Sequence, residues 1–421
     1  MIVFIRKSCL LHLITSETNL REMDYSMNKM TATVALMSSF TLAICFIILG
    51  SISVELMSAL DINEAKFGTL IMGMFLTSCF VQLFIGPLVD KIGFKPVAIL
   101  GFSVVCISMF ILAFSSSFAF ALLSCILMGV GAMSVNTVGN TLIPIVLFEG
   151  KDPARASNFG NGFFGLGYIL TPLLIVFIIK TLDLSYNVAL MIVGGLSLVF
   201  LLFALFTNFP KVSTGFRYSI ILKVLVKPTV LIASLALFCY ISLEISMGTW
   251  IKPLMEEFFG GRVNIEASAK AGIVLSLFGV TMMAGRFITA SVRNLTVIGS
   301  KVIIFSSALA IVTIIIMMLA KGPVLGVTAV LLIGLAFAPI FPTIVGITFA
   351  KFDPSLYGTI FGIMFAIGLL GGTFVPKIIG NLSVGSTIQG SLLVVLILAV
   401  ILFVIAISID QTSNYSDKKG N

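Results

Sequence analysis

Long apolar stretches dominate this chain, and short polar segments separate them at fairly regular intervals. Each stretch holds about twenty residues, the length at which an α-helix crosses the hydrocarbon core of a bilayer. The runs are continuous, whereas a transmembrane β-barrel shows shorter segments of alternating polarity. The pattern predicts an all-α integral membrane protein with twelve transmembrane helices. We place them at residues 32–57, 67–88, 95–115, 118–146, 158–180, 187–209, 229–252, 268–290, 300–320, 323–349, 357–379 and 386–409.

The longest interior polar segment lies between the sixth and seventh spans and carries several basic residues. An Asp-Pro pair recurs on the two sides of this segment: Asp152-Pro153 follows the fourth span, and Asp353-Pro354 follows the tenth. Duplicated halves are typical of carriers that rock one half against the other around a central site. We expect two pseudo-symmetric six-helix bundles, 32–209 and 229–409, a cytoplasmic linker at 210–228, and cytoplasmic tails at 1–31 and 410–421.

Composition supports the membrane assignment and excludes several functions. Of 421 residues, 59% are hydrophobic and 10% charged, and the mean hydropathy is +1.20. Most basic residues fall on the side that holds both termini, so the positive-inside rule places both termini in the cytoplasm. We expect the protein to lie in the inner (cytoplasmic) membrane. The net charge of +8 therefore reflects topology rather than nucleic-acid binding. We expect a monomer.

The sequence lacks the catalytic and cofactor-binding motifs of soluble enzymes. The single histidine, His12, lies in the predicted N-terminal tail, which argues against a histidine metal site or a Ser-His triad. Nucleotide-binding motifs and nucleophile–base pairs are also missing from the sequence, and the six cysteines show no paired loop spacing. We therefore expect no enzyme activity, metal or cofactor, and transport energised by a gradient.

Two glutamates, Glu55 and Glu244, are the acidic residues that the pattern places well inside spans. A carboxylate within a membrane is costly unless it faces protein or a water-filled cavity, so both are candidates for solute or ion binding. The alternatives are that Glu55 reaches the outer surface and that Glu244 is only a structural hydrogen-bond partner. Lys and Arg, including Arg286, fall near span ends, which favours a neutral or cationic solute.

Polar side chains in the fourth, fifth and seventh spans complete the candidate site. Asn136 and Asn140 are spaced i, i+4 and share a helix face. Asn161 and Tyr240 add an amide and a phenol, and amides suit polyhydroxylated solutes. The amides could instead hold neighbouring helices together. The tenth span contains Pro339 and Pro342, which predict a kink that exposes backbone carbonyls.

The loop between the second and third spans carries a dense pattern of glycine and charge. Gly86, Leu88, Asp90, Lys91, Gly93 and Lys95 follow the spacing G-x-L-x-D-K/R-x-G-x-K. Glycines permit close backbone approach, and the opposite charges can form and release contacts, so the loop is a candidate gate. Arg155, at the start of the fifth span, is a further candidate for the gate.

This loop resembles the signature of the major facilitator superfamily, and short motifs resemble its fucose:proton symporter branch. These motifs are Glu55 to Leu60, Gly129-x-Gly131 with Asn140, Arg155 to Asn158 with Gly165-x-Gly167, Tyr240-x-x-x-Glu244, and Phe341-Pro342-Thr343. The resemblance implies that Glu55 occupies the position of a first-helix aspartate, and Asn161 that of a sugar-binding glutamine. Asn136 replaces a glutamate used in proton coupling, which leaves sodium coupling, a proton route based on Glu244 and uniport open.

The sequence thus predicts a secondary transporter that moves a small neutral polar solute, a sugar or polyol, by alternating access. We expect cation-coupled uptake, with a proton or sodium ion as the coupling partner. Efflux of amphipathic drugs or metabolites is the alternative, because 37 phenylalanines and 19 methionines could line an adaptable cavity. A non-transporting membrane sensor is a more remote alternative.

Overall fold

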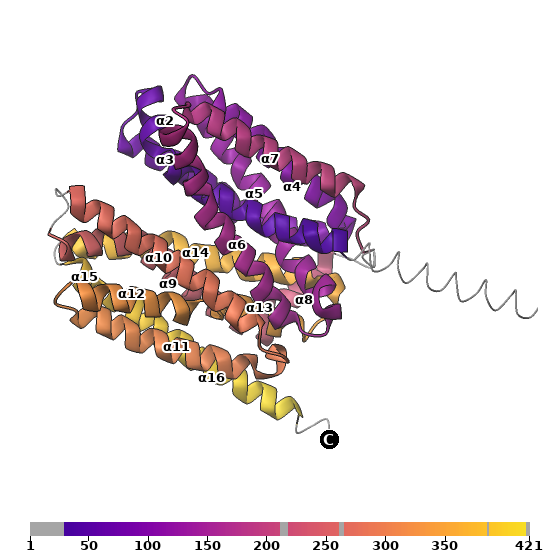
Figure 1. The fold of residues 1–421 in the computed structure, drawn as a ribbon. Helices are drawn as coiled ribbons and strands as arrows, with labels where there is room; N and C mark the ends of the chain where they lie inside the picture. The colour runs from indigo at the N-terminus through magenta and orange to yellow at the C-terminus, as the bar shows by residue number, and fades with distance from the viewer. Residues whose placement is uncertain (1–28, 211–217, 261–264, 385–386, 418–421) are drawn as a thin grey trace, which may run out of the picture.

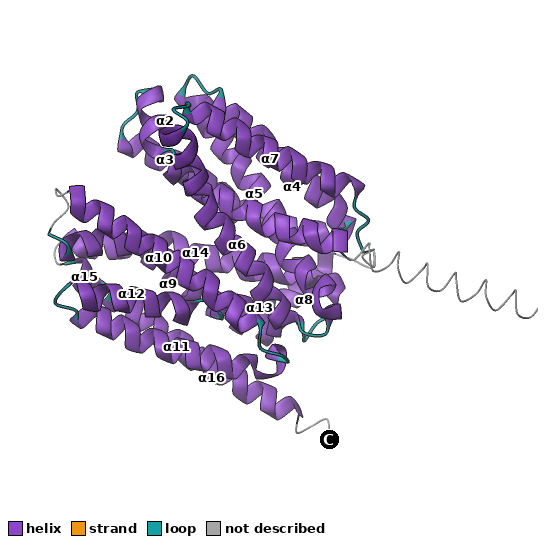
Figure 2. Cartoon of the chain, viewed as in Figure 1, coloured by secondary structure: helices purple, strands orange, loops and turns teal. Residues whose placement is uncertain are grey.

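The computed structural model describes residues 29–210, 218–260, 265–384 and 387–417, and within these ranges every regular element is a helix (Figure 2). Most of the predicted N-terminal tail, the centre of the predicted linker (211–217) and residues 418–421 of the predicted C-terminal tail lie outside the described residues.

Twelve helical segments of the described chain are long and apolar enough to cross a membrane, as the sequence pattern predicts. The first spans Lys29–Ser51. The others are α3 (Glu64–Ile92), α4 (Phe94–Ala113), α5 (Phe118–Val146), α6 (Pro153–Val176), α7 (Tyr186–Phe206), α9 (Pro228–Phe258), α10 (Ile265–Ala290), α11 (Leu295–Leu319), α12 with α13 (Pro323–Phe337 and Ile340–Phe349), α14 (Tyr357–Val384) and α16 (Leu393–Asp417). Short helices α2 (Ser53–Leu60), α8 (Tyr218–Leu225) and α15 (Ile388–Ser391) lie between them.

Several helix boundaries differ from the predicted ones, among them the following three. The first span ends at Ser51, and the chain continues as the separate helix α2. The fifth span begins at Pro153, earlier than expected, because the Asp152 carboxylate caps it by accepting a 3.2 Å hydrogen bond from the Arg155 amide. The last helix continues beyond its predicted end to Asp417.

The helices form two bodies, one from the first helix to α7 and the other from α9 to α16 (Figure 1). The bodies come together where α6 meets α13, and they diverge toward the end that carries α2 and α15 (Figure 1). We call these two ends of the molecule the closed end and the open end.

Glycine makes the close approach at the closed end possible. A Cβ added at Gly86 of α3 would lie 2.2 Å from the carbonyl oxygen of Gly358 in α14. A Cβ added at Gly346 of α13 would lie 2.2 Å from the Cα of Ala154 in α6. Both distances are shorter than any real side-chain contact, so the two halves touch backbone to backbone here.

Candidate functional site

A cavity of about 330 Å³ lies between the two halves. Aromatic rings form much of its wall, namely Phe46, Phe75, Phe164, Phe278, Phe341 and Phe365. The polar lining residues are Asn136, Asn140, Asn161, Tyr168, Glu244, Thr249 and Arg286. An apolar pocket of this size with a few polar groups from several helices is the usual form of a small-molecule site.

Three asparagines form a hydrogen-bonded ladder on the N-terminal half. On α5, the Asn140 Nδ2 group donates to the Asn136 Oδ1 atom at 2.8 Å, as their i, i+4 spacing predicts. On α6, the Asn161 Nδ2 group donates to the Asn140 Oδ1 atom at 3.2 Å and to the Ser157 carbonyl at 3.0 Å. The ladder holds α5 against α6, and it also faces the cavity.

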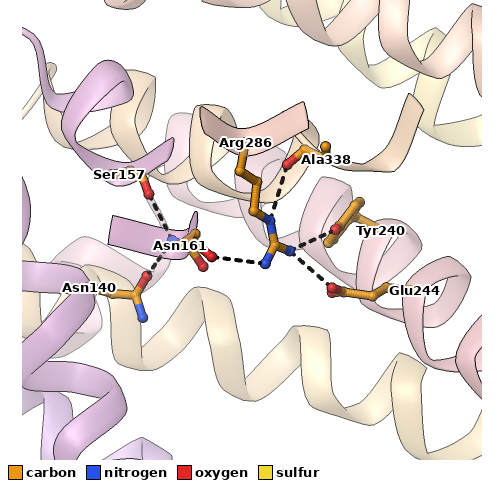
Figure 3. Close-up of polar contacts among 7 residues, drawn as sticks. All are labelled: Asn140, Ser157, Asn161, Tyr240, Glu244, Arg286 and Ala338. Atoms are coloured by element: carbon orange, nitrogen blue, oxygen red, sulfur yellow. Dashed lines mark hydrogen bonds and ion pairs between the residues drawn. The ribbon is translucent and has the colours of Figure 1, made fainter. Parts of the chain in front are cut away.

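Arg286 of α10 joins this ladder to the C-terminal half (Figure 3). One terminal nitrogen, Nη1, donates to the Asn161 carbonyl at 3.3 Å. The other, Nη2, donates to the Glu244 Oε1 atom at 3.1 Å and to the Tyr240 hydroxyl oxygen at 3.5 Å. The site therefore contains an ion pair at the point where both halves meet.

The proline break in the tenth span supplies a fourth contact of this arginine. The Arg286 Nε atom donates to the Ala338 carbonyl at 3.4 Å. In an unbroken helix that carbonyl would accept from the residue four positions later, but Pro342 has no amide hydrogen. The guanidinium satisfies a backbone group that the sequence leaves without a helical partner; the predicted break between α12 and α13 is present, but the Ala338 carbonyl is buried against Arg286 rather than exposed to the cavity.

The structure brings most of the predicted solute-binding residues together, with one exception. Asn136, Asn140, Asn161 and Glu244 line the cavity, and Tyr240 lies fully buried behind the ion pair. Glu55 does not line this cavity. It lies on α2 and is partly exposed, because the first span ends at Ser51.

The inference from span positions that no basic side chain reaches the cavity is wrong. Arg286 lies one turn from the C-terminal end of α10, as the sequence indicates, yet its guanidinium lines the cavity and is 3% exposed. An arginine near a span end can reach the interface, so its sequence position alone does not reveal this placement; a charge that stays within the span is expected to pair with an opposite charge. Glu244 is that partner, so the reason for restricting the solute to neutral or cationic compounds no longer holds.

At the closed end, the predicted loop contacts the opposite half through Asp90. This carboxylate is 2% exposed and accepts hydrogen bonds from the Gly358 amide at 2.8 Å and from the Thr359 amide at 2.6 Å. Both amides belong to the first turn of α14, whose unpaired N–H groups and helix dipole favour an anion.

The other loop residues lie around this contact. Gly93 ends α3 with φ at +89°, a conformation that L side chains rarely adopt, and α4 starts directly after it. Lys91 is exposed, and Lys95 is half-buried. The loop is therefore built around one buried carboxylate and two glycines, Gly86 and Gly93, with its cations nearer the surface.

A second contact between the halves involves Asp152, which sequence reasoning used only as a marker of the repeat. Its carboxylate accepts from the Leu295 and Thr296 amides, both at 2.9 Å, at the start of α11. Arg155, one turn later, donates from Nε to the Ala290 carbonyl at 2.8 Å, at the end of α10. An acid thus meets the N-terminus of one helix and an arginine meets the C-terminus of another, as helix dipoles favour.

Comparison with known proteins gives the family. The family model of the Major Facilitator Superfamily matches residues 34–376. Among curated proteins, the synaptic vesicular amine transporters of Mus musculus and Homo sapiens are 28% and 27% identical over 182 residues. That match covers 41% of this chain and only 34% of those transporters, so the chain matches about a third of their length.

Solved structures share the fold over nearly the whole chain. The transporter FucP in the outward conformation superposes with a TM-score of 0.73, at 18% identity, over 89% of this chain and 97% of FucP. The human organic anion transporter MFSD10 gives a TM-score of 0.70 at 18% identity, over 90% and 99% of the two chains. The chain belongs to the Major Facilitator Superfamily, and it is a multi-pass membrane transporter rather than an enzyme.

Proposed function

We propose that the protein takes up a small polyhydroxylated solute, such as a sugar or polyol, by alternating access. A proton or sodium ion drives the solute across the inner membrane, and both termini face the cytoplasm. Asn136, Asn140 and Asn161 hold the solute, and Glu244 carries the coupling charge.

One observation supports alternating access most directly: a cavity with a few polar groups lies between two halves that are joined by buried hydrogen bonds at one end. Asp90 and Asp152 each cap a helix of the opposite half, while the bodies diverge toward the open end (Figure 1). Breaking these contacts would let the halves rock and expose the same cavity at the closed end. The overlap with FucP in its outward conformation agrees with this arrangement.

The asparagine ladder supports a polyhydroxylated solute. Among the described residues, the Asn136 amide nitrogen donates one hydrogen bond, to the Met133 sulfur at 4.0 Å, so its second hydrogen can be donated to a ligand. The Asn161 Oδ1 atom accepts no hydrogen bond from that part of the chain and can accept one from a hydroxyl. The volume of about 330 Å³ lies at the small end of ligand sites, which suits a compact solute.

Efflux of an amphipathic organic cation is a second candidate, and the aromatic wall favours it. Phe46, Phe75 and Phe164 could stack on an apolar ring or contact an ammonium group. The partial match to vesicular amine transporters agrees with this option. Export of amines from cells, without any growth defect on sugars, would favour efflux over uptake.

Alternating access can be tested without knowing the solute. In a variant that lacks the native cysteines, Gly248→Cys places a thiol in the cavity, where an added Cβ meets no atom within 4 Å. A second pair, Ala154→Cys and Thr296→Cys, spans the closed end, because the Ala154 amide lies 3.0 Å from the Thr296 hydroxyl oxygen.

Membrane-impermeant maleimide is then applied from each side of the membrane. When the Ala154–Thr296 pair is oxidised to a disulfide, we expect the thiol at position 248 to be labelled from one side only. When the pair is reduced, we expect labelling from both sides. Labelling from one side in both states would contradict alternating access.

A further inference from the structure

Arg286 has no role in the function proposed above, since a neutral sugar needs no fixed cation. The Arg286–Glu244 pair is unequal in exposure: the Arg286 side chain is 3% exposed and the Glu244 side chain 26%. Glu244 is therefore the member of the pair that is more accessible from the cavity, and it occupies the Nη2 atom of Arg286. A ligand carboxylate that binds this atom must replace Glu244 there.

We propose that the solute carries one carboxylate, that this carboxylate replaces Glu244 on Arg286, and that a proton binds Glu244 in the same step. The solute class is then a small polyhydroxylated monocarboxylate. The inference rests on the proposed carrier function and deepens it by naming the charge on the solute and the coupling ion.

The charge balance in the site predicts that the anion and the proton bind together. The empty site is neutral, because Arg286 is paired with Glu244. A bound anion alone would leave a net negative charge in a low-dielectric cavity, and a bound proton alone would leave the guanidinium without a counter-ion. Only proton and anion together restore neutrality, so each stabilises the other.

The surroundings of Glu244 provide no other charge to replace the proton. Arg286 faces it from α10, Tyr168 from α6, and Tyr240 from one turn earlier on α9. The α13 and α14 helices contribute Phe341, Phe365 and Leu369 to the cavity. Arg286 is thus the one permanent cation that contacts Glu244 among the described residues, and Glu244 is the proton carrier.

Geometry also suits a ligand with two kinds of polar group. Arg286 presents a planar fork of donors that can bind a carboxylate through two parallel hydrogen bonds. Its Nη1 atom contacts the Asn161 carbonyl, so the carboxylate-binding position adjoins the asparagine ladder that would hold hydroxyl groups (Figure 3). One small molecule can occupy both positions.

The test compares pairs of probes that differ in the carboxylate: gluconate with sorbitol, and glucuronate with glucose. Thermal shift and calorimetric titration of the purified full-length protein measure binding. Titration in two buffers of different ionisation enthalpy counts the protons that accompany it. We expect a carboxylate to bind more tightly than its uncharged partner, with uptake of about one proton per anion.

Three variants separate the roles of the two charges. Arg286→Gln should weaken carboxylate binding by about 100-fold. Glu244→Gln should still bind the carboxylate, but without proton uptake and without dependence on pH. The double variant keeps the site neutral and controls for folding, and it should lose the preference for the carboxylate.

Preference for the uncharged partners, binding of no probe, carboxylate binding without proton uptake, or dependence on sodium in place of pH would each overturn the inference. These outcomes are independent of the labelling test at position 248. Two-sided labelling with failed carboxylate binding would retain the carrier and reject this solute class, whereas the reverse result would reject the carrier.

Discussion

Asp90→Asn should shift the carrier away from the state with a sealed closed end. The carboxylate accepts two backbone hydrogen bonds from the first turn of α14, at 2.8 and 2.6 Å, and it is buried. The asparagine side chain has the same shape, but it keeps one acceptor oxygen and no charge. One of the two bonds is therefore lost, together with the attraction of the helix dipole for the anion.

The loss can be estimated from the structure. A hydrogen bond to a charged group contributes about 1.5–3 kcal/mol, and the dipole adds up to about 1 kcal/mol near a helix end. We take about 2 kcal/mol as a conservative value for the total, which corresponds to about a 30-fold change in the equilibrium between the two states. Because the contact joins the two halves, the change acts only on the state in which the closed end is sealed.

The labelling rate of Gly248→Cys from the closed-end side measures this equilibrium, and Asp90→Asn should raise it about 30-fold. Asp353→Asn is a matched control: Asp353 also caps a backbone amide, that of Ser355 at 2.9 Å, but both residues lie in the C-terminal half. It should leave the rate unchanged. An unchanged rate in Asp90→Asn, with normal thermal unfolding, would refute the role of this contact.

Three further predictions concern other parts of the fold. Gly86→Ala should prevent the closed end from sealing, because the new Cβ would lie 2.2 Å from the Gly358 carbonyl oxygen. Gly68→Ala is the control: its new Cβ would have no atom within 4 Å, so it should behave as wild type in the same labelling assay. Gly93→Ala should lower the free energy of unfolding by about 1–2 kcal/mol, measured by thermal denaturation, because φ there is +89°. Glu55→Gln should leave the pH dependence of transport unchanged, since Glu55 does not line the cavity, and a pH profile that shifts on this change would contradict that placement.

The sequence was sufficient to predict the twelve spans, because a bilayer imposes length and apolarity on every segment that crosses it. It was also sufficient to predict that Asn136 and Asn140 share one face of α5, because i, i+4 spacing is a property of one helix. The candidate gating loop was proposed from its glycines and charges, but its contact partner was not predicted. That partner is the N-terminus of α14, which lies far along the chain and is brought to Asp90 only by tertiary packing.

Arg286 shows why the central site was harder to predict. Its position near the end of α10 was predicted, but the inference that a residue near a span end lies outside the central cavity was wrong. The Asn161 carbonyl and the Ala338 carbonyl reach it from two other helices. No local pattern reveals such contacts, because they depend on how α6, α10 and the α12–α13 break pack together.

The central claim is that one cavity is exposed alternately at the two ends of the molecule. Electron–electron distance measurements between paired spin labels, on the protein in nanodiscs, can test it. One pair lies across the open end, at Ser58 and Asn381, and the other lies near the closed end, at Glu149 and Lys301. All four positions are exposed. We predict two populations, in which a short distance in one pair accompanies a long distance in the other, and Asp90→Asn should enrich the population with the longer Glu149–Lys301 distance. A single fixed distance in both pairs, unchanged by Asp90→Asn, would contradict the account.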